Sequence, residues 1–517
     1  MQATSHDVVI VGGGHNGLAA AAYLARAGRS VLLLEAQPSL GGATVSADAF
    51  DGMGARLSRY SYLVSLLPRQ IVDDLGLQLR LARRRYSSYT PMPGGDSGLL
   101  VDNHDADATA RSFAAVGAAA DAERFDEFYA RSGELARRLW PTVTEPLLRR
   151  SELGELVGDD ALLRDFVDRP LGEVIERTFA SDLVRGVVLT DGLISTFADA
   201  HQADLRHNIC FLYHVMGGGT GDWDVPIGGM GQVSDQLAAV ARAAGAELRT
   251  GARATGVEDG AVTWTDESGM SSRATARHVL WAAAPAVLDE LAGSPGERVE
   301  GAQVKVNLLL SRLPRVREAG VAPEAAFGGT FHINETYTQL QTAHDDAVAG
   351  RIPSPMPAEI YCHSITDPSI LSPQLQESGA QTLTVFTLQT PDRLLDEVES
   401  LPAARAQLQR ATLDSLSSVL AEPIEDVIMR TPEGDLCVET KTTRDLQDIL
   451  SMPGGNIFHA PLTWPWVDDD APLQTAAQRW GVDTPYRGIL LAGAGSRRGG
   501  GVSALGGYHA ARAVLES

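Results

Sequence analysis

Two short apolar runs near the start of the chain predict buried parallel strands. Residues 8–11 and 31–34 are uninterrupted runs of Val, Ile and Leu, whereas a strand with one solvated face would alternate apolar and polar residues. The alanine-rich segment Leu18–Ala27 lies between them and is followed by Gly28, which predicts a helix that ends there. Strand, helix and strand therefore form a βαβ unit within the first 35 residues.

Glycines and one acidic residue occupy the turns of this unit. Gly12, Gly14 and Gly17 form a G-x-G-x-x-G pattern directly after the first strand, and Glu35 closes the second. In this setting the first glycine permits a tight turn, the second lets the backbone approach a pyrophosphate, and the third lets the helix pack close to the strand. The helix N-terminus attracts phosphate, and the acid accepts hydrogen bonds from a ribose diol. The pattern predicts dinucleotide binding.

The C-terminal part of the chain has the same order of strand, glycines and helix. Residues 489–495 run from an apolar strand into glycines, and glycines 499–501 lead into an alanine-rich helix predicted over 502–515. The N-terminus of such a helix would stabilise negative charge on a reduced flavin ring. A further glycine loop, 41–43, follows Glu35. These elements favour a two-part FAD site over an NAD site, and they require the two ends of the chain to meet.

The composition is that of a globular chain with a strong negative charge. Its 517 residues correspond to roughly three domain-sized units, and 44% hydrophobic with 21% charged residues exclude wholesale disorder. Lys and Arg number 43 against 66 Asp and Glu, which leaves a net charge of −23. The chain therefore lacks the basic footprint of nucleic-acid binding, and we expect no such partner.

Targeting and metal-binding signals are weak. No apolar run approaches the ~18 residues of a transmembrane helix, and the polar start Met1–Asp7 lacks the apolar core of a signal peptide. Cys210, Cys362 and Cys437 are too far apart for a CxxC pair and suit a reducing compartment. We expect a cytoplasmic protein without a transmembrane segment or a metal site, and interpret the acidic run 468–470 as a solvated loop.

Several longer strings resemble one known family. They include VVIVGGGHNGLAAAAYLARAG at 8–28, SRYSYLVSLLPRQIVDDLGL at 58–77, KVNLLLSRLP at 305–314 and GILLAGAGSRRGGGVSALGGYHAARAVL at 488–515. On these strings the chain resembles, nearly end to end, the phytoene-dehydrogenase-like flavoproteins of the glutathione-reductase and amine-oxidase fold group. Within that group it is most similar to the branch named pyridine nucleotide-disulfide oxidoreductase domain-containing protein 2. Because the chain has no CxxC pair, disulfide chemistry is excluded despite that name.

The resemblance implies an α/β fold in which a glutathione-reductase-type, Rossmann-like FAD-binding domain lies beside a discontinuous α+β substrate domain. The FAD-binding domain would comprise residues 1–105, 215–300 and 435–517. Residues 106–214 would form a mostly helical substrate or lid region, and residues 301–434 the α+β substrate domain.

Local patterns agree with this layout. Residues 122–139 carry apolar side chains at helical spacing and stop at a proline. Residues 304–310 and 382–388 read as strands, and residues 403–421 as a helix.

The resemblance also assigns cofactor-binding positions, some of which the glycine patterns had already indicated. The residue matching Ala254 lies beside the adenine in this fold group, Gly229 lies in a turn near the flavin, and Gly493, Gly495 and Val502 match positions that contact pyrophosphate and isoalloxazine. The full set is Gly12, Gly14, Asn16, Gly17, Glu35, Gly41, Gly42, Ala43, Gly229, Ala254, Gly493, Gly495, Gly501 and Val502.

Residues near the expected flavin supply candidates for chemistry. His459 lies in a string that the family places just before the flavin loop, and it is either a base or a structural histidine. Arg497 stands where relatives often have His, and it would bind an anionic substrate or be a surface cation. These two are the candidate catalytic residues. The candidate substrate-pocket residues are Arg59, Tyr60, Tyr62, Trp464, Trp466 and Arg498. Core packing is the alternative for the two tryptophans, and a surface contact with pyrophosphate or a carboxylate is the alternative for Arg498.

These observations predict an FAD-dependent dehydrogenase or oxidase that transfers a hydride from a C–C or C–N bond of a small organic substrate to flavin N5. Oxygen or a quinone would accept the electrons, because a second dinucleotide fingerprint is missing. The alternatives are a carotenoid or polyene desaturase or isomerase, an amine or amino-acid oxidase, and a non-enzymatic flavin scaffold. The sequence leaves the substrate and the oligomeric state open, a homodimer included.

Overall fold

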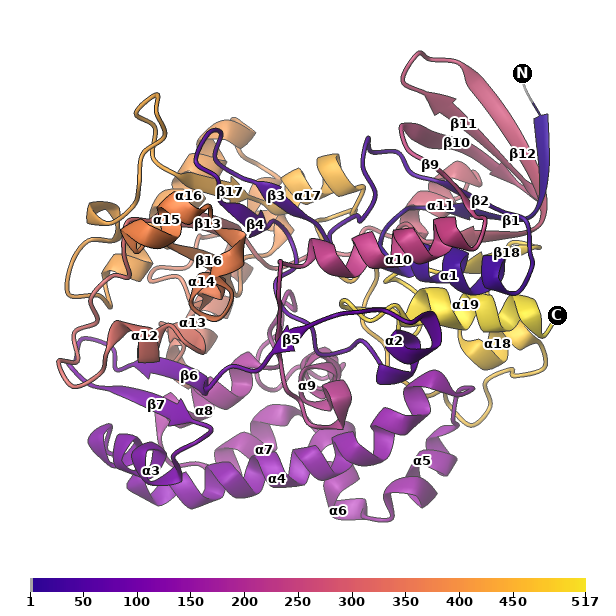
Figure 1. Cartoon of the computed structure of the whole chain (residues 1–517). Coiled ribbons are helices and arrows are strands. Elements are labelled where there is room, and N and C mark those ends of the chain that lie inside the picture. The colour runs from indigo at the N-terminus through magenta and orange to yellow at the C-terminus, as the bar shows by residue number, and fades with distance from the viewer. Residues whose placement is uncertain (1–2) are drawn as a thin grey trace.

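A computed structural model describes residues 3–517 and is built on two large sheets (Figure 1). Met1 and Gln2, with which the polar start of the chain begins, lie outside the described residues. The first sheet has the strand order β10-β11-β12-β1-β2-β9, and β18 pairs with β12. Its strands are β1 (Ala3–Val11), β2 (Val31–Leu34), β9 (Glu247–Arg249), β10 (Ala252–Glu258), β11 (Ala261–Asp266), β12 (Ser271–Trp281) and β18 (Ile489–Leu491).

The apolar runs become the central parallel strands of the first sheet, as predicted. β1 pairs in parallel with both β2 and β12, and β12 pairs in parallel with β18. Val8, Val9 and Ile10 are fully buried because helices or strands cover both faces of the sheet. β10 and β11 are antiparallel extensions at one edge.

Three helices pack beneath this sheet and bring the chain ends together. The helix α1 (His15–Arg26) packs against both α10 (Gly231–Ala243) and α19 (Leu505–Leu515), as Figure 1 shows. The α1–α19 approach is close, because a Cβ at Gly507 would lie 1.8 Å from the carbonyl oxygen of Asn16. The first and last helices are therefore direct neighbours.

The last helix starts later than predicted. α19 begins at Leu505 rather than at residue 502. Ala504 adopts a left-handed conformation with φ 59°, and the hydroxyl of Ser503 accepts a hydrogen bond from the N–H of Leu505. These features hold residues 499–503 as a loop ahead of the helix.

The second sheet lies on the other side of the molecule. Its order is β17-β13-β16-β15-β14-β6-β7, and every neighbouring pair is antiparallel except β14 with β6. Its strands are β6 (Tyr86–Pro91), β7 (Gly98–Asp102), β13 (Lys305–Leu310), β14 (Thr330–Ile333), β15 (Ala358–Tyr361), β16 (Gln381–Thr387) and β17 (Val438–Lys441). The predicted strands 304–310 and 382–388 correspond to β13 and β16.

The two sheets do not divide the chain at the predicted domain boundaries. β6 and β7 lie within residues 1–105, and β17 lies within residues 435–517, yet all three pair with strands of the second sheet. Hydrogen-bond pairing between strands places them there, and such pairing is not encoded in a local pattern. The boundaries themselves stay a prediction.

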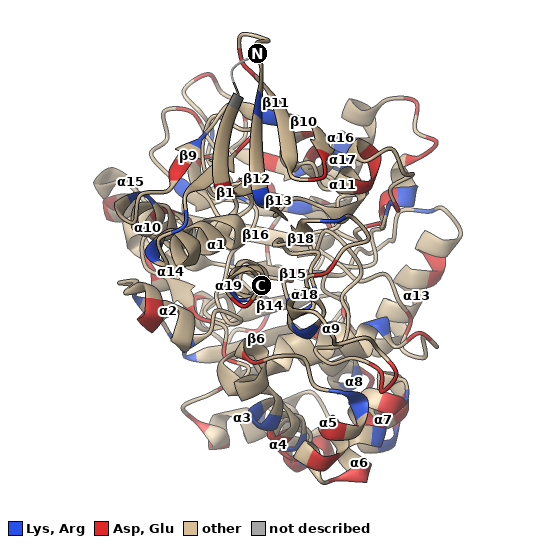
Figure 2. Ribbon diagram, turned by 90° about the vertical axis from the view of Figure 1, so that its right-hand side faces the viewer, with Lys and Arg blue, Asp and Glu red and all other residues tan. Residues whose placement is uncertain are grey.

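Residues 106–214 are mostly helical, as expected, and pack beside the second sheet (Figure 1). The predicted helix over 122–139 is confirmed as α4, whose Phe125 and Phe128 pack against other aromatic rings. The helices are α3 (Ala106–Ala115), α4 (Ala122–Leu139), α5 (Arg150–Val157), α6 (Asp160–Leu163), α7 (Leu171–Thr178), α8 (Asp182–Thr190) and α9 (Arg206–Met216). Figure 2 shows that the outer helices α3–α7 carry both acidic and basic residues.

Shorter elements connect these layers. The small paired strands are β3 (Ser46–Asp48), β4 (Arg56–Ser58), β5 (Leu81–Ala82) and β8 (Val225–Pro226). The remaining helices are α2 (Arg69–Leu75), α11 (Pro285–Leu291), α12 (Pro323–Ala326), α13 (Tyr337–Val348), α14 (His363–Thr366), α15 (Pro373–Ser378), α16 (Leu401–Ser417), α17 (Thr443–Leu450) and α18 (Ala476–Trp480). α16 is the helix predicted over 403–421. Across residues 3–517, no helix combines the length and hydropathy that crossing a bilayer requires.

Candidate functional site

A long cavity runs from the carboxyl ends of β1 and β2 to the second sheet and the helical region. One end is lined by Gly12, Gly14, Leu34, Glu35, Ala36, Gln37 and residues 252–254. The middle is lined by His15, Gly42, Ala43, Thr44, His459, Gly501 and Val502. The far end is lined by residues 60–63, Ile194, Trp223, Gln303, Lys305 and Phe386. We call these the nucleotide end, the middle and the far end.

The glycine turn at the nucleotide end is shaped to receive a ligand. Gly12 has φ +107°, a conformation that favours glycine, and its N–H donates to the carbonyl of Leu34 at 2.8 Å. A Cβ at Gly17 would lie only 2.0 Å from the Gly12 carbonyl oxygen, so this glycine is required for packing. A Cβ at Gly14 would meet no atom within 4 Å. Since Gly14 lines the cavity, its open side fits the approach of a pyrophosphate.

The carboxylate of Glu35 lies at the same end and is held by backbone donors. It accepts hydrogen bonds from the N–H of Gly13 at 2.6 Å and from the N–H of Gln37 at 2.7 Å. Each carboxylate oxygen keeps a further lone pair, and Glu35 lines the cavity. This arrangement fits a ribose hydroxyl donor.

The two ends of the chain meet in the middle of the cavity. His15 contacts the hydroxyl of Thr44 at 3.0 Å through Nδ1 and the carbonyl of Gly501 at 3.1 Å through Nε2. The Asn16 amide donates to the carbonyl of Gly499 at 3.2 Å, while its buried Oδ1 has no protein partner. The N-terminal glycine turn is thereby joined to the C-terminal glycine loop, which is the meeting that a two-part FAD site requires.

His459 lies at the cavity wall in a strained conformation. Its φ is +65°, rare for a residue with a Cβ, and its buried Nδ1 has no protein partner. Burial lowers the pKa of His459 to about 4, so the ring is neutral at pH 7. A neutral ring with a free nitrogen suits a hydrogen bond to a ligand better than it suits proton uptake.

The other predicted cofactor positions fall into two groups. Ala43, Gly42, Ala254, Gly501 and Val502 line the cavity with Gly12, Gly14, Asn16 and Glu35. Gly17, Gly41, Gly229, Gly493 and Gly495 are outside the lining, and for each a Cβ would lie within 2.6 Å of a neighbouring atom. These five glycines shape the turns around the cavity through close packing.

The predicted arginine pair does not line the cavity. Arg497 donates from Nη1 to the carbonyls of Trp464 at 2.9 Å and Trp466 at 2.6 Å. Arg498 is 2% exposed and donates to the carbonyls of Thr142 and Glu145. Backbone carbonyls therefore bind Nη1 of each guanidinium group and link neighbouring loops, while Nε and Nη2 of Arg498 are buried without a protein partner. Contact of either arginine with substrate stays a prediction.

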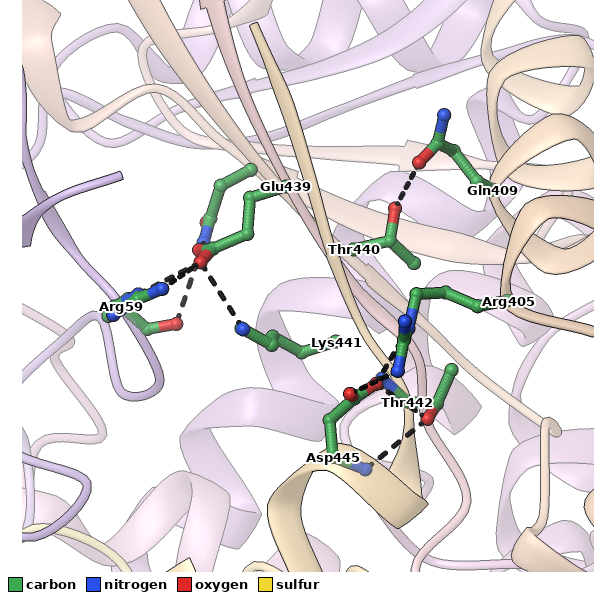
Figure 3. Close-up of polar contacts among 9 residues, drawn as sticks. Arg59, Arg405, Gln409, Glu439, Thr440, Lys441, Thr442 and Asp445 are labelled. Carbon is green, nitrogen blue, oxygen red and sulfur yellow. Dashed lines mark hydrogen bonds and ion pairs between the residues drawn. The ribbon is translucent and has the colours of Figure 1, made fainter. Parts of the chain in front are cut away.

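The tryptophans and Arg59 are also outside the lining. The rings of Trp464 and Trp466 stack on each other with centroids 4.7 Å apart. Arg59 forms an ion pair with Glu439 of β17, as Figure 3 shows. Of the candidate pocket residues, Tyr60 and Tyr62 line the cavity.

The far end contains functional candidates that the sequence analysis missed. The ring of Tyr62 lies against those of Tyr361 and Phe386, with centroids 4.5 Å and 5.9 Å apart. Lys305 is 4% exposed and lies with its ammonium 5.3 Å from the centre of the Tyr62 ring. The sequence contains one signal that could have pointed to Lys305, which is a lysine at the start of the otherwise mostly apolar segment 305–310. Trp223 and Phe386 carried no comparable signal, because aromatic residues at such positions are common in cores.

Comparisons with known proteins agree with this geometry. A family model described as FAD dependent oxidoreductase matches residues 7–120. An uncharacterized protein of Mycobacterium tuberculosis is 52% identical over 98% of this chain and 97% of its own length. The pyridine nucleotide-disulfide oxidoreductase domain-containing protein 2 of Rattus norvegicus is 30% identical over 99% of this chain and 93% of its own length.

The fold is shared with solved flavoenzymes. Cyclohexylamine oxidase from Brevibacterium oxydans has a TM-score of 0.55 and 16% identity over 99% of this chain and 98% of its own. This likeness confirms the predicted amine-oxidase fold group, and the predicted family and cofactor are confirmed with it. The chain belongs to the pyridine nucleotide-disulfide oxidoreductase domain-containing protein 2 family of FAD-dependent oxidoreductases.

Proposed function

We propose that this protein is a dehydrogenase or oxidase that desaturates a C–C or C–N bond of a small organic substrate. The observation that carries the proposal is the continuity of one cavity from the nucleotide end to an aromatic far end. A cofactor bound along the first part would present its reactive ring to a substrate held in the second. Sites of this kind, at the junction of sheets and domains, are typical of ligand-binding enzymes.

The residues of this chain have separate roles in the proposed reaction. Gly14 and Glu35 would hold the pyrophosphate and the ribose, while His15 and Asn16 keep the glycine turn joined to the loop at 499–501. When bound, FAD supplies the capacity to accept a hydride. The rings at the far end would orient the substrate and exclude water from it.

The reaction balances without a catalytic acid or base from the protein at the carbon that is oxidised. A hydride would pass from one substrate atom to the bound flavin, a proton would pass from the neighbouring C–H or N–H to solvent, and a double bond would form between the two substrate atoms. Oxygen or a quinone then takes the two electrons and two protons, which regenerates the oxidised protein. His459 is proposed to act as a hydrogen-bonding group toward the cofactor, since its neutral ring lines the middle of the cavity.

Spectroscopy of the purified protein tests this proposal. We expect bound FAD, with the absorbance of an oxidised flavin, and bleaching when a substrate is added under anaerobic conditions. Release of hydrogen peroxide in air would identify oxygen as the acceptor, and reduction of an added quinone without peroxide would identify a dehydrogenase. A protein that binds no FAD after reconstitution would refute the proposed function.

Two assays address the alternatives. Flotation with liposomes would favour a polyene desaturase or isomerase, because such an enzyme must take its substrate from a lipid phase. Peroxide release on addition of amines would favour an amine oxidase. A flavin-loaded protein that no organic substrate reduces would support the non-enzymatic scaffold.

A further inference from the structure

Lys305 places a buried positive charge in the wall of the far end. It is the first residue of β13, it is 4% exposed, and it lines the cavity. Its ammonium donates to the carbonyls of Ser58 at 3.0 Å and Tyr60 at 2.8 Å. An ammonium has three N–H donors, so one remains for a partner in the cavity.

The nearest carboxylate does not neutralise Lys305, because other groups already engage it. Glu439 of β17 accepts hydrogen bonds from Arg59 and from the amide of Asn307, at 3.0 Å, and lies 3.4 Å from the ammonium of Lys441. Figure 3 shows Glu439 between Arg59 and Lys441. Glu439 is thus already paired with two cations, Arg59 and Lys441, and it forms no ion pair with Lys305.

The cavity offers no other acid at the far end. Among residues 3–517, the only carboxylate in the lining is Glu35, which belongs to the nucleotide end. The far end is otherwise lined by aromatic and aliphatic side chains and by two neutral polar groups. The hydroxyl of Ser61 donates to the carbonyl of Ala43 at 2.9 Å, and Nε2 of Gln303 donates to the carbonyl of Gly455 at 2.8 Å. A cationic substrate would meet a like charge here, and an anionic one would meet an unpaired cation.

We propose that the substrate carries a carboxylate that pairs with Lys305, on an apolar body that packs against Tyr62, Trp223 and Phe386. This inference rests on the proposed function, and it names the substrate class of the same site. A charge-assisted hydrogen bond in a site of low dielectric is strong, which makes the carboxylate the anchor of the bound molecule. The proposed substrate is therefore a carboxylate, whereas the name of cyclohexylamine oxidase, whose fold this chain shares, refers to an amine.

Three probes of similar size and different charge test the proposal on the FAD-loaded protein. Phenylacetate, phenylacetamide and 2-phenylethylamine are titrated, and the change in flavin absorbance gives each dissociation constant. We expect phenylacetate to bind at least tenfold more tightly than phenylacetamide, and 2-phenylethylamine to bind weakest. An amine that binds more tightly than the carboxylate would overturn the proposal.

A pair of variants then assigns the effect to one residue. Lys305→Met should weaken phenylacetate binding by roughly 10- to 100-fold, the loss expected for one charged hydrogen bond, and change phenylacetamide binding less than threefold. Lys305→Arg, which keeps the charge, should retain most of the preference for the carboxylate. Arg69→Met is the control, because it removes a positive charge from an exposed position on α2 that is outside the cavity lining and does not contact Glu439. It should leave all three constants unchanged.

The outcomes separate this proposal from the proposed function. A wild-type protein without FAD would refute the function itself. If FAD is bound but Lys305→Met leaves the phenylacetate constant unchanged, or alters only the rate of flavin reduction, the substrate class alone is refuted. If Lys305→Met does not fold, the probe series on the wild-type protein and Lys305→Arg still decides the question.

Discussion

The carboxylate of Glu35 accepts a hydrogen bond of 2.6 Å from the backbone N–H of Gly13, so the acid that closes β2 also fixes the glycine turn that closes β1. A second bond, from the N–H of Gln37 at 2.7 Å, fixes the other oxygen. Glu35 is 8% exposed, and what remains open faces the cavity. The residue therefore connects the shape of the turn with the proposed contact to ribose.

Replacing this acid should weaken FAD binding. Glu35→Gln keeps the size of the side chain but removes the charge, and loss of charged hydrogen bonds costs about 1.5–3 kcal/mol, or roughly 10- to 100-fold in affinity. Titration of the apoprotein with FAD, followed by flavin fluorescence, measures the dissociation constant. Asp48→Asn, at the exposed last residue of β3, is the control and should bind as the wild type does. An unchanged constant for Glu35→Gln would remove its role in binding.

Two glycines of the same turn should respond differently to alanine. Gly14→Ala adds a methyl group to open space, so the apoprotein should unfold at the wild-type temperature while FAD binding is lost or weakened at least tenfold. Gly17→Ala forces a Cβ to 2.0 Å from the Gly12 carbonyl and should lower the melting temperature of the apoprotein itself. Calorimetry with and without FAD separates the two effects. Wild-type FAD affinity in Gly14→Ala would show that the ligand does not approach this backbone.

A buried carboxyl group beyond the far end should make stability depend on pH. Glu359 is 1% exposed and accepts a hydrogen bond from Tyr361, and burial raises its pKa to about 8. The native state then keeps a proton that the unfolded chain releases above its own pKa of about 4.3. The free energy of unfolding should therefore fall as the pH rises from about 4.3 to 8.

Glu359→Gln cannot ionise and should avoid that loss. Its melting temperature should match the wild type near pH 4 and exceed it increasingly up to pH 8. Glu422 is the control, because its pKa is shifted in the opposite direction. Hydrogen bonds from Arg312 and Arg315 lower the pKa of this carboxyl group to about 2. Glu422→Gln should be less stable than the wild type by a constant amount between pH 5 and 8. A constant difference for Glu359→Gln as well would contradict the prediction.

The proposed anchor should titrate near neutrality. Burial lowers the pKa of Lys305 to about 7. Above that pH the free protein loses the ammonium, so the dissociation constant of phenylacetate should rise by roughly tenfold per pH unit, while that of phenylacetamide stays level. Titrations at pH 6, 7, 8 and 9 measure both constants. A phenylacetate constant that does not vary with pH would exclude an ionising partner.

The nucleotide end could be predicted because its parts are close in sequence. Gly12, Gly14 and Glu35 belong to one βαβ unit whose strands and helix are each encoded by a local pattern. The helix α4 was predictable for the same reason. The C-terminal glycine loop that completes the middle of the cavity was likewise visible as a local pattern of strand, glycines and helix, and the resemblance to the family added the single positions that would contact the cofactor.

The far end could not be predicted, since its lining depends on tertiary packing. Lys305, Trp223 and Phe386 come from segments separated by about 80 residues each, and only the pairing of β13 with β16 and the position of the helical region bring them together. Arg497 shows how tertiary contacts also affect a residue that a local pattern had singled out. Its place beside the glycine loop suggested contact with substrate, whereas its Nη1 donates to the carbonyls of residues 464 and 466 and the side chain is outside the cavity lining, so a role toward substrate stays a prediction.

The position of β12 between β1 and β18 has a consequence for biosynthesis. A ribosome must translate more than half of the chain before β1 gains this neighbour, and nearly all of it before β18 and α19 emerge. The nascent polypeptide therefore carries an incomplete nucleotide site throughout elongation. Loading of FAD is expected to follow release from the ribosome, and a nascent chain arrested before residue 489 should not retain the cofactor.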